Sequence, residues 1–354
     1  MSRFLNERVS ALKPYVPGEQ PKGREYIKLN TNESPYPPSP SAIRAASEAA
    51  ERLMLYPDPD CTELLRAVAA DLGVSASQLI LTNGSDEVLN FAFMAYCDER
   101  TPAVFADITY GFYKVFADLN GIPMREIPLR DDFSLNIEDY ISACGTVFIA
   151  NPNAPTGLYL PLSEIERLLK SDSERIVVVD EAYVDFGSQS AVSLIGKYDN
   201  LLVTRTFSKS RSMAGARLGF GVASDAIIDD LMRIKYSTNP YNVNRMTAAA
   251  GIGSVADADY FEKNRKEIIE TREWTSRELS ALGFSLTDSA ANFIFAKHER
   301  IGGEELYLAL KARGVLVRHF SGERIKEYNR ITVGSPREMR VLVDTVKSIL
   351  EEKI

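Results

Sequence analysis

The sequence predicts an α/β fold with a mostly parallel sheet, followed by a smaller α+β region. Between residues 79 and 255, short apolar stretches alternate with longer helical patterns. This alternation is typical of parallel strands joined by crossover helices. From about residue 257, a long helical stretch leads into further strand-like stretches and a final helix. A chain of 354 residues is long enough for one large and one small domain.

The first 29 residues show little periodicity and contain a turn-rich stretch over 12–18. We expect them to form an arm that lies on the surface of another part of the molecule. Helices are expected next over 41–53 and 62–72, the second closed by Gly73. A strand over 79–82 and a small polar turn over 83–87 then lead into a helix that ends near residue 97.

The rest of the predicted large domain continues the alternation of strands and helices. Strands are expected over 103–105, 124–128, 146–150, 176–180, 201–206 and 218–222, and helices over 110–120, 227–236 and 241–255.

The C-terminal region begins with a predicted helix over 257–282 that bridges to a second domain. Strands are expected near 284–287, 293–296, 315–318 and 330–333. The final helix has a clear start, because Ser335 and Glu338 form a capping box with Pro336 in the first turn. We therefore expect an arm over 1–29, a large domain over 30–255 and a small domain over 256–354.

Composition excludes several classes of protein. The formal net charge of −8 argues against nucleic acid as the main partner. No apolar run reaches the ~20 residues that a membrane span needs, and the first residues lack the apolar core of a signal peptide. Because Cys61, Cys97 and Cys144 lie far apart, we expect reduced packing residues in a cytoplasmic protein. No Cys/His cluster has the spacing of a zinc site, so no metal is expected.

Polar side chains follow three of the predicted strands where each strand ends. They are Asn153, Asp180 and Lys209. Ligands of open parallel sheets bind at the carboxyl ends of the strands. A lysine between two serines is usually solvated, but an amine, an acid and an amide at one edge suit pyridoxal phosphate. The lysine forms a Schiff base with this cofactor, and the acid keeps the pyridine nitrogen protonated.

Four motifs in order strengthen this hypothesis: Asn-Pro-Asn-x-Pro-Thr-Gly at 151–157, Asp-Glu-Ala-Tyr at 180–183, Ser-Lys-Ser at 208–210 and Ala-Gly-x-Arg-x-Gly at 214–219. Together they resemble the fold type I aminotransferases of the aspartate aminotransferase superfamily. The resemblance implies an aspartate aminotransferase-like fold, with a large domain that binds pyridoxal 5'-phosphate and a smaller C-terminal domain. Ala216 departs from the pattern, because the family often has Leu there.

The resemblance also implies a role for each matching residue. Lys209 is the Schiff-base amine and later moves the substrate's proton, and Asp180 pairs with the pyridinium, although a carboxylate can also simply cap a strand end. Tyr183 and Asn153 reach the phenolic oxygen, and Tyr110 stacks on the ring unless it is an ordinary core or surface tyrosine. Phosphate-loop positions are matched by Ser85, Asp86, Thr206, Ser208 and Arg217.

The strand, turn and helix start over 79–87 independently suit an anion, because free N–H groups face outward at a helix N-terminus. The same residues would also make an ordinary capped helix with acids in its first turn. Since Asp86 is acidic, we expect its backbone N–H rather than its carboxylate to face a phosphate.

Nearly the whole chain resembles the histidinol-phosphate aminotransferase family. The resemblance rests on residues 12–15, 29–35, 56–58, 241–244 and 330–334. It implies transamination between histidinol phosphate and 2-oxoglutarate, giving imidazole acetol phosphate and glutamate, in histidine biosynthesis.

The same resemblance implies which residues bind the substrates. It places Tyr15 and Asn153 near the substrate and brings Tyr56 from the partner subunit of a homodimer. Arg318 and Arg330 could take the phosphate of one substrate and a carboxylate of the other through their forked geometry. The alternative for both is an ordinary surface arginine.

Three other functions remain open as hypotheses. Threonine-phosphate decarboxylase and aromatic amino-acid aminotransferases share this fold. A non-catalytic regulator that binds the cofactor would need an added DNA-binding module, and none fits before Ser34.

Overall fold

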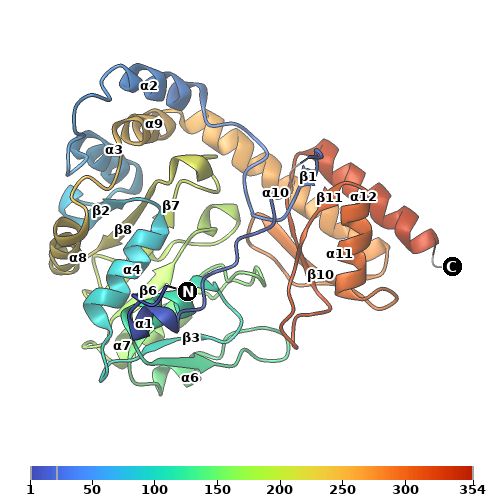
Figure 1. Ribbon diagram of the computed structural model, residues 1–354, viewed down its shortest axis with the longest axis horizontal. Helices are drawn as coiled ribbons and strands as arrows, with labels where there is room; N and C mark the ends of the chain where they lie inside the picture. Colours follow the sequence, from blue (N-terminus) through green and yellow to red (C-terminus); the bar gives the residue numbers. More distant parts are fainter. Residues whose placement is uncertain (1, 21–22, 353–354) are drawn as a thin grey trace.

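The computed structural model describes residues 2–20 and 23–352. Its larger part is built around a seven-stranded sheet (Figure 1). Strand β8 runs antiparallel to its neighbours β2 and β7, and the other neighbouring pairs are parallel. The predicted mostly parallel sheet is therefore confirmed. In spatial order the strands are β2 (Leu79–Thr82), β8 (Gly219–Ala223), β7 (Leu201–Thr206), β6 (Val177–Asp180), β5 (Thr146–Ala150), β3 (Ala103–Ala106) and β4 (Met124–Ile127).

The central strands are apolar on both sides because helices cover both faces of the sheet. On one face, Val177 and Val179 of β6 belong to a core shared with α3, α7 and α9. On the other face, Val178 belongs to a core shared with α4, α5 and α8. Successive side chains of a strand point to opposite faces, so one run of valines supplies two cores. The helices of this part are α2 (Pro40–Ala50), α3 (Thr62–Leu72), α4 (Ser85–Tyr96), α5 (Phe112–Asn120), α6 (Ile137–Ile141), α7 (Leu162–Ser171), α8 (Asp225–Thr238) and α9 (Arg245–Ala256).

The C-terminal part is reached through the long helix α10 (Ala258–Ala281), which runs from the end of α9 toward α11 and α12 (Figure 1). Its four-stranded antiparallel sheet has the order β12-β13-β10-β9. Ser335 and Glu338 form the capping box that was predicted for the final helix. The elements are β9 (Phe284–Leu286), β10 (Phe293–His298), α11 (Gly303–Ala312), β12 (Arg318–His319), β13 (Asn329–Thr332) and α12 (Pro336–Glu351).

The predicted strand over 315–318 is instead two short strands in different sheets. β12 joins the antiparallel sheet, whereas β11 (Val315–Leu316) pairs in parallel with β1 (Ile27–Lys28). Leu29 is 1% exposed and belongs to the core of the C-terminal part. The N-terminal arm, which begins with the short helix α1 (Glu7–Ser10), is thus tied to the C-terminal part at its end. We propose that the chain forms the predicted large and small domains, and that the N-terminal arm connects them through the pairing of β1 with β11.

Two further observations concern the composition-based expectations. No helix within residues 2–20 and 23–352 is long and apolar enough to cross a membrane. Cys61 and Cys97 are buried and unpaired, whereas Cys144 is exposed, so it is not the packing residue that we expected. Cys144 lies in the turn between α6 and β5, outside both cores of the sheet.

Candidate active site

The carboxyl ends of neighbouring parallel strands meet at a cavity of about 380 Å³ beside Lys209. β6 and β7 pair in parallel, so Asp180 at the end of β6 and Thr206 at the end of β7 face the same edge. Lys209 follows in the loop after β7. The predicted residues that line this cavity are Ser85, Asp86, Tyr110, Asp180, Tyr183, Thr206, Ser208, Lys209 and Arg217.

Asp180 lies at the buried end of the cavity and is 6% exposed. Its carboxylate accepts hydrogen bonds from the Tyr113 hydroxyl at 3.1 Å and from Thr204 Oγ1 at 3.2 Å. Burial raises the pKa of Asp180 to about 6, although these two hydroxyls act in the opposite direction. Both partners are neutral, and a buried carboxylate is stabilised by a cation. A protonated ring nitrogen is a cation of suitable chemistry for this position.

Lys209 and Tyr183 lie close together in the lining of the cavity. Lys209 Nζ is 3.3 Å from the carbonyl oxygen of Thr31 and 5.7 Å from the centre of the Tyr183 ring. The Tyr183 hydroxyl accepts a hydrogen bond from Asn32 Nδ2 at 2.9 Å. Neighbouring residues of the N-terminal segment, Thr31 and Asn32, therefore contact both the amine and the phenol.

Another group of lining residues has the chemistry of a phosphate site. Helix α4 begins at Ser85, and no side chain of the described residues caps it, so its first N–H groups can serve an anion. Thr206 Oγ1 and Ser208 Oγ are 2.9 Å apart, and Arg217 Nη2 lies 3.0 Å from Asp86 Oδ2. The Asp86 carboxylate also accepts a hydrogen bond from the Tyr110 hydroxyl at 2.7 Å. Its charge is thus held by protein groups and does not need to face a phosphate.

Strand β8 passes very close to this helix start because residue 219 is glycine. A Cβ atom at Gly219 would lie 2.3 Å from the backbone nitrogen of Ser85 and 2.4 Å from the carbonyl carbon of Gly84. Any larger residue would displace the turn that presents the N–H groups of α4.

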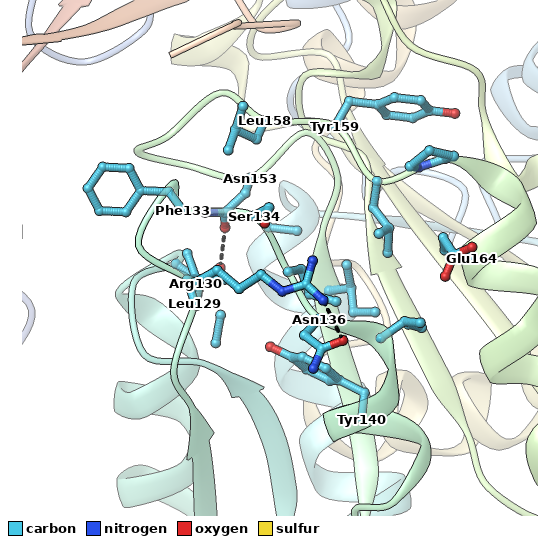
Figure 2. Close-up of a pocket in the computed structure, with 18 of the residues that line it drawn as sticks. Leu129, Arg130, Phe133, Ser134, Asn136, Tyr140, Asn153, Leu158, Tyr159 and Glu164 are labelled. Atoms are coloured by element: carbon cyan, nitrogen blue, oxygen red, sulfur yellow. Dashed lines mark hydrogen bonds between the residues drawn. The ribbon is translucent and has the colours of Figure 1, made fainter. Parts of the chain in front are cut away.

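Asn153 is the exception among the predicted cofactor residues. Its Oδ1 accepts from Thr109 Oγ1 at 2.7 Å, and its Nδ2 donates to the Ile108 carbonyl and to Thr156 Oγ1, each at 3.0 Å. Figure 2 shows Asn153 at the wall of a different cavity of about 440 Å³. Ala154 lines the Lys209 cavity instead. Asn153 thus lies between two residues that line the Lys209 cavity, Pro152 and Ala154, and its expected roles toward the cofactor and the substrate stay predictions.

A larger cavity of about 690 Å³ adjoins the first one and shares Lys209, Tyr183 and Tyr110 with it. The predicted substrate residues Tyr15, Arg318 and Arg330 line this second cavity. The two arginines are direct partners in the antiparallel pairing of β12 with β13. Like charges directly opposite each other are unfavourable in a sheet, so this pair is suited to a shared anion.

Arg330 is the more enclosed of the two arginines. Its guanidinium lies 5.4 Å from the Phe293 ring centre and 5.7 Å from that of Phe320. Nη2 donates to the Asn30 carbonyl at 3.0 Å, and the buried Nε has no hydrogen-bond partner among the described residues. Burial lowers the pKa of Arg330. A buried guanidinium with an unused donor favours binding of a carboxylate or phosphate.

Tyr56 does not reach either cavity of its own chain. Its side chain is 79% exposed and stacks on Tyr241 with the ring centres 4.7 Å apart. A contribution of Tyr56 to a site would therefore have to be made to a second subunit.

Sequence reasoning missed several residues that the structure places at the site. Thr204 could have been found, because it lies two positions before Thr206 on β7 and faces the same side. Tyr113 could have been suspected from its place in the helix after Tyr110. The contacts of Asn32 with Tyr183 and of Thr31 with Lys209 join residues far apart in the sequence, and no local pattern indicates them.

Comparisons with known proteins agree with this geometry. The model of the class I and II aminotransferases matches residues 24–346. The histidinol-phosphate aminotransferase of Clostridium acetobutylicum is 47% identical over 351 residues, which cover 99% of this chain and 100% of that protein. That of Marinomonas sp. is 50% identical over 354 residues, with coverages of 99% and 100%. A solved histidinol-phosphate aminotransferase from Sinorhizobium meliloti, in complex with pyridoxal-5'-phosphate, has a TM-score of 0.89 at 24% identity and covers 99% of both chains.

Proposed function

Because this chain belongs to the class I and II aminotransferase family, and within it to the histidinol-phosphate aminotransferases, we propose that it transfers an amino group between histidinol phosphate and 2-oxoglutarate. The products are imidazole acetol phosphate and glutamate, and the reaction also runs in reverse. This is a step of histidine biosynthesis. The paired arginines Arg318 and Arg330 at the second cavity carry the proposal most directly.

The residues beside Lys209 fit pyridoxal phosphate, on which this family of enzymes depends. Asp180 would hold the proton of the ring nitrogen, and Tyr183 would donate to the phenolic oxygen. Ser85, Thr206, Ser208 and Arg217 would bind the phosphate. When bound, this cofactor supplies an electron sink for the electrons left behind when the substrate loses a proton. Lys209 Nζ would both attach the cofactor and take that proton from the carbon that bears the amine.

The second cavity would select the substrates by their charge. Histidinol phosphate carries a phosphate, and glutamate carries carboxylates, so both present an anion to the same arginines in turn. Arginine binds either anion by two parallel hydrogen bonds. Arg330 is enclosed by Phe293 and Phe320, and exclusion of water strengthens such a contact.

We also propose that the enzyme is a cytoplasmic homodimer. Leu53, Met54, Leu55 and Tyr56 are between 53% and 79% exposed in one continuous stretch. An apolar stretch of this kind marks an interaction surface, and Tyr56 would reach the site of the partner subunit from it. Free cysteines are consistent with a reducing compartment.

The proposed function is tested by offering the enzyme four amines side by side, each with 2-oxoglutarate as the acceptor of the amino group. These are histidinol phosphate, threonine phosphate, phenylalanine and unphosphorylated histidinol. We expect histidinol phosphate to give the highest kcat/KM. A higher value for phenylalanine would support the aromatic aminotransferase alternative, and release of carbon dioxide from threonine phosphate without transamination would support the decarboxylase.

A further inference from the structure

A short N-terminal segment, residues 29–33, contacts β13 of the C-terminal part on one side. On the other side it contacts Lys209 and Tyr183 of the candidate active site. The backbone N–H of Thr332 donates to the Leu29 carbonyl at 2.9 Å, and Arg330 donates to the Asn30 carbonyl at 3.0 Å. On its other side, the segment accepts a hydrogen bond from Lys209 through the Thr31 carbonyl. Its position is therefore fixed from both directions.

Asn32 is the residue of this segment that contacts Tyr183. It is 1% exposed and has a φ of 56°, a left-handed conformation that asparagine adopts more readily than most residues. Its backbone carbonyl accepts from Asn292 Nδ2 at 3.1 Å, and its Nδ2 donates to the Tyr183 hydroxyl at 2.9 Å. Asn32 can donate to the Tyr183 hydroxyl only if its side-chain amide keeps the NH₂ group on that side.

Thr332 determines that orientation. Its Oγ1 accepts the backbone N–H of Asn32 at 2.9 Å and lies 3.0 Å from Asn32 Oδ1. A hydroxyl has a single proton. Since Oγ1 acts as the acceptor for the N–H, its proton is available for Oδ1. The amide therefore turns its oxygen toward Thr332 and its NH₂ group toward Tyr183.

We infer that Asn32, oriented by Thr332, is a positioning residue that makes the Tyr183 hydroxyl a hydrogen-bond donor to the ligand beside Lys209. A hydroxyl that accepts from Asn32 keeps its own proton free to donate into the cavity. This inference rests on the proposed function only in that pyridoxal phosphate occupies the cavity. The phenolic oxygen would accept a hydrogen bond from the Tyr183 hydroxyl, and a hydrogen-bond donor at that oxygen stabilises its charged form.

The test is a pH titration of the visible absorption of the holoenzyme, which does not depend on the amine substrate. Asn32→Gly removes the side chain without straining the left-handed backbone. We expect the pH midpoint of the absorption change to rise by about one unit, a tenfold change in proton affinity, because the phenolic oxygen loses its oriented donor. Asn32→Asp should raise the pH midpoint further, because the Tyr183 hydroxyl would donate its hydrogen bond to the new carboxylate.

Variants of Thr332 and Tyr183 separate this role from a purely structural one. Thr332→Val should raise the midpoint in the same direction, and Thr332→Ser, which keeps the hydroxyl, should leave it unchanged. In a Tyr183→Phe background, Asn32→Gly should cause no further shift. With histidinol phosphate, Asn32→Gly should lower kcat by roughly fivefold to tenfold, the value of one hydrogen bond, and change KM much less.

Two results would overturn the inference. One is a midpoint in Asn32→Gly equal to that of the wild type. The other is the same shift in the wild-type and Tyr183→Phe backgrounds, which would show that Asn32 does not act through Tyr183. A wild-type protein that binds no pyridoxal phosphate would instead refute the proposed cofactor, and this inference with it. A wild-type titration that behaves as expected, together with no turnover of histidinol phosphate, would refute only the proposed substrate.

Discussion

Burial of Asp180 favours its neutral form, whereas its proposed function requires the ionised form. Burial raises its pKa to about 6 from the ordinary value of 3.8. A carboxyl group whose folded-state pKa is raised stabilises the fold below its unfolded-state pKa, and this contribution is lost as the pH rises through the folded-state value. At pH 8 the ionised Asp180 therefore destabilises the cofactor-free protein, by about 3 kcal/mol for a shift of about two units.

Asp180→Asn should accordingly stabilise the cofactor-free protein at pH 8 by about 2–3 kcal/mol. The difference from the wild type should shrink as the pH falls toward 4, where Asp180 is protonated. Chemical denaturation of both cofactor-free proteins at the two pH values measures this. Glu181, whose pKa burial raises to about 7, titrates in both proteins and cancels in the comparison. Equal stabilities at pH 8 would contradict the buried, uncompensated carboxylate.

The residues of the site could be predicted where the polar side chain ends a buried strand or follows it directly. Asp180 and Thr206 are such residues, and both line the Lys209 cavity. The contacts of the Asn153 side chain could not be predicted, because the side of a turn to which a side chain points depends on distant partners. For Asn153 these include the carbonyl of Ile108 and the hydroxyl of Thr109. Asn32 was missed for the same reason.

At the scale of elements, the close approach of β8 to the start of α4 shapes the phosphate end of the site. The contact depends on Gly219. Gly219→Ala should lower the free energy of unfolding by about 1–3 kcal/mol, the usual range for overpacking, and should weaken pyridoxal phosphate binding because the turn at Gly84 must move. Denaturation and a fluorescence titration with the cofactor measure the two effects.

Gly196→Ala is the matched control, because a Cβ atom at that glycine would meet no atom of the described part of the chain within 4 Å. It should change stability by less than about 0.5 kcal/mol, as expected for a surface substitution. If Gly219→Ala behaved like this control, the close packing of β8 on α4 would not be needed for the site.

Most elements could be predicted because their signals are local. The valine run of β6 and the capping box of α12 are examples. The pairing of β1 with β11 could not be predicted, since each strand has only two residues and neither shows a periodic pattern. Such short strands exist because chain segments far apart in the sequence meet.

At the scale of the whole molecule, the proposed dimer is needed to complete the site. Tyr56 lies away from the cavities of its own chain, so we expect each site to combine Lys209 of one subunit with Tyr56 of the other. Lys209→Ala and Tyr56→Ala homodimers should each have little activity. Mixed heterodimers should regain part of it, because one of their two sites has both residues intact. Heterodimers that form but remain inactive would contradict shared sites.

We propose that the arginine pair selects a phosphorylated amine, and one ratio of catalytic efficiencies tests this selection. This is kcat/KM for histidinol phosphate divided by kcat/KM for histidinol, measured in the wild type, Arg318→Ala and Arg330→Ala. A charge-assisted hydrogen bond is worth about 1.5–3 kcal/mol, so the wild-type ratio should be at least about tenfold. Arg330→Ala should remove most of this preference and should also weaken the binding of glutamate. A ratio unchanged in both variants would show that these arginines do not bind the phosphate and would contradict the account.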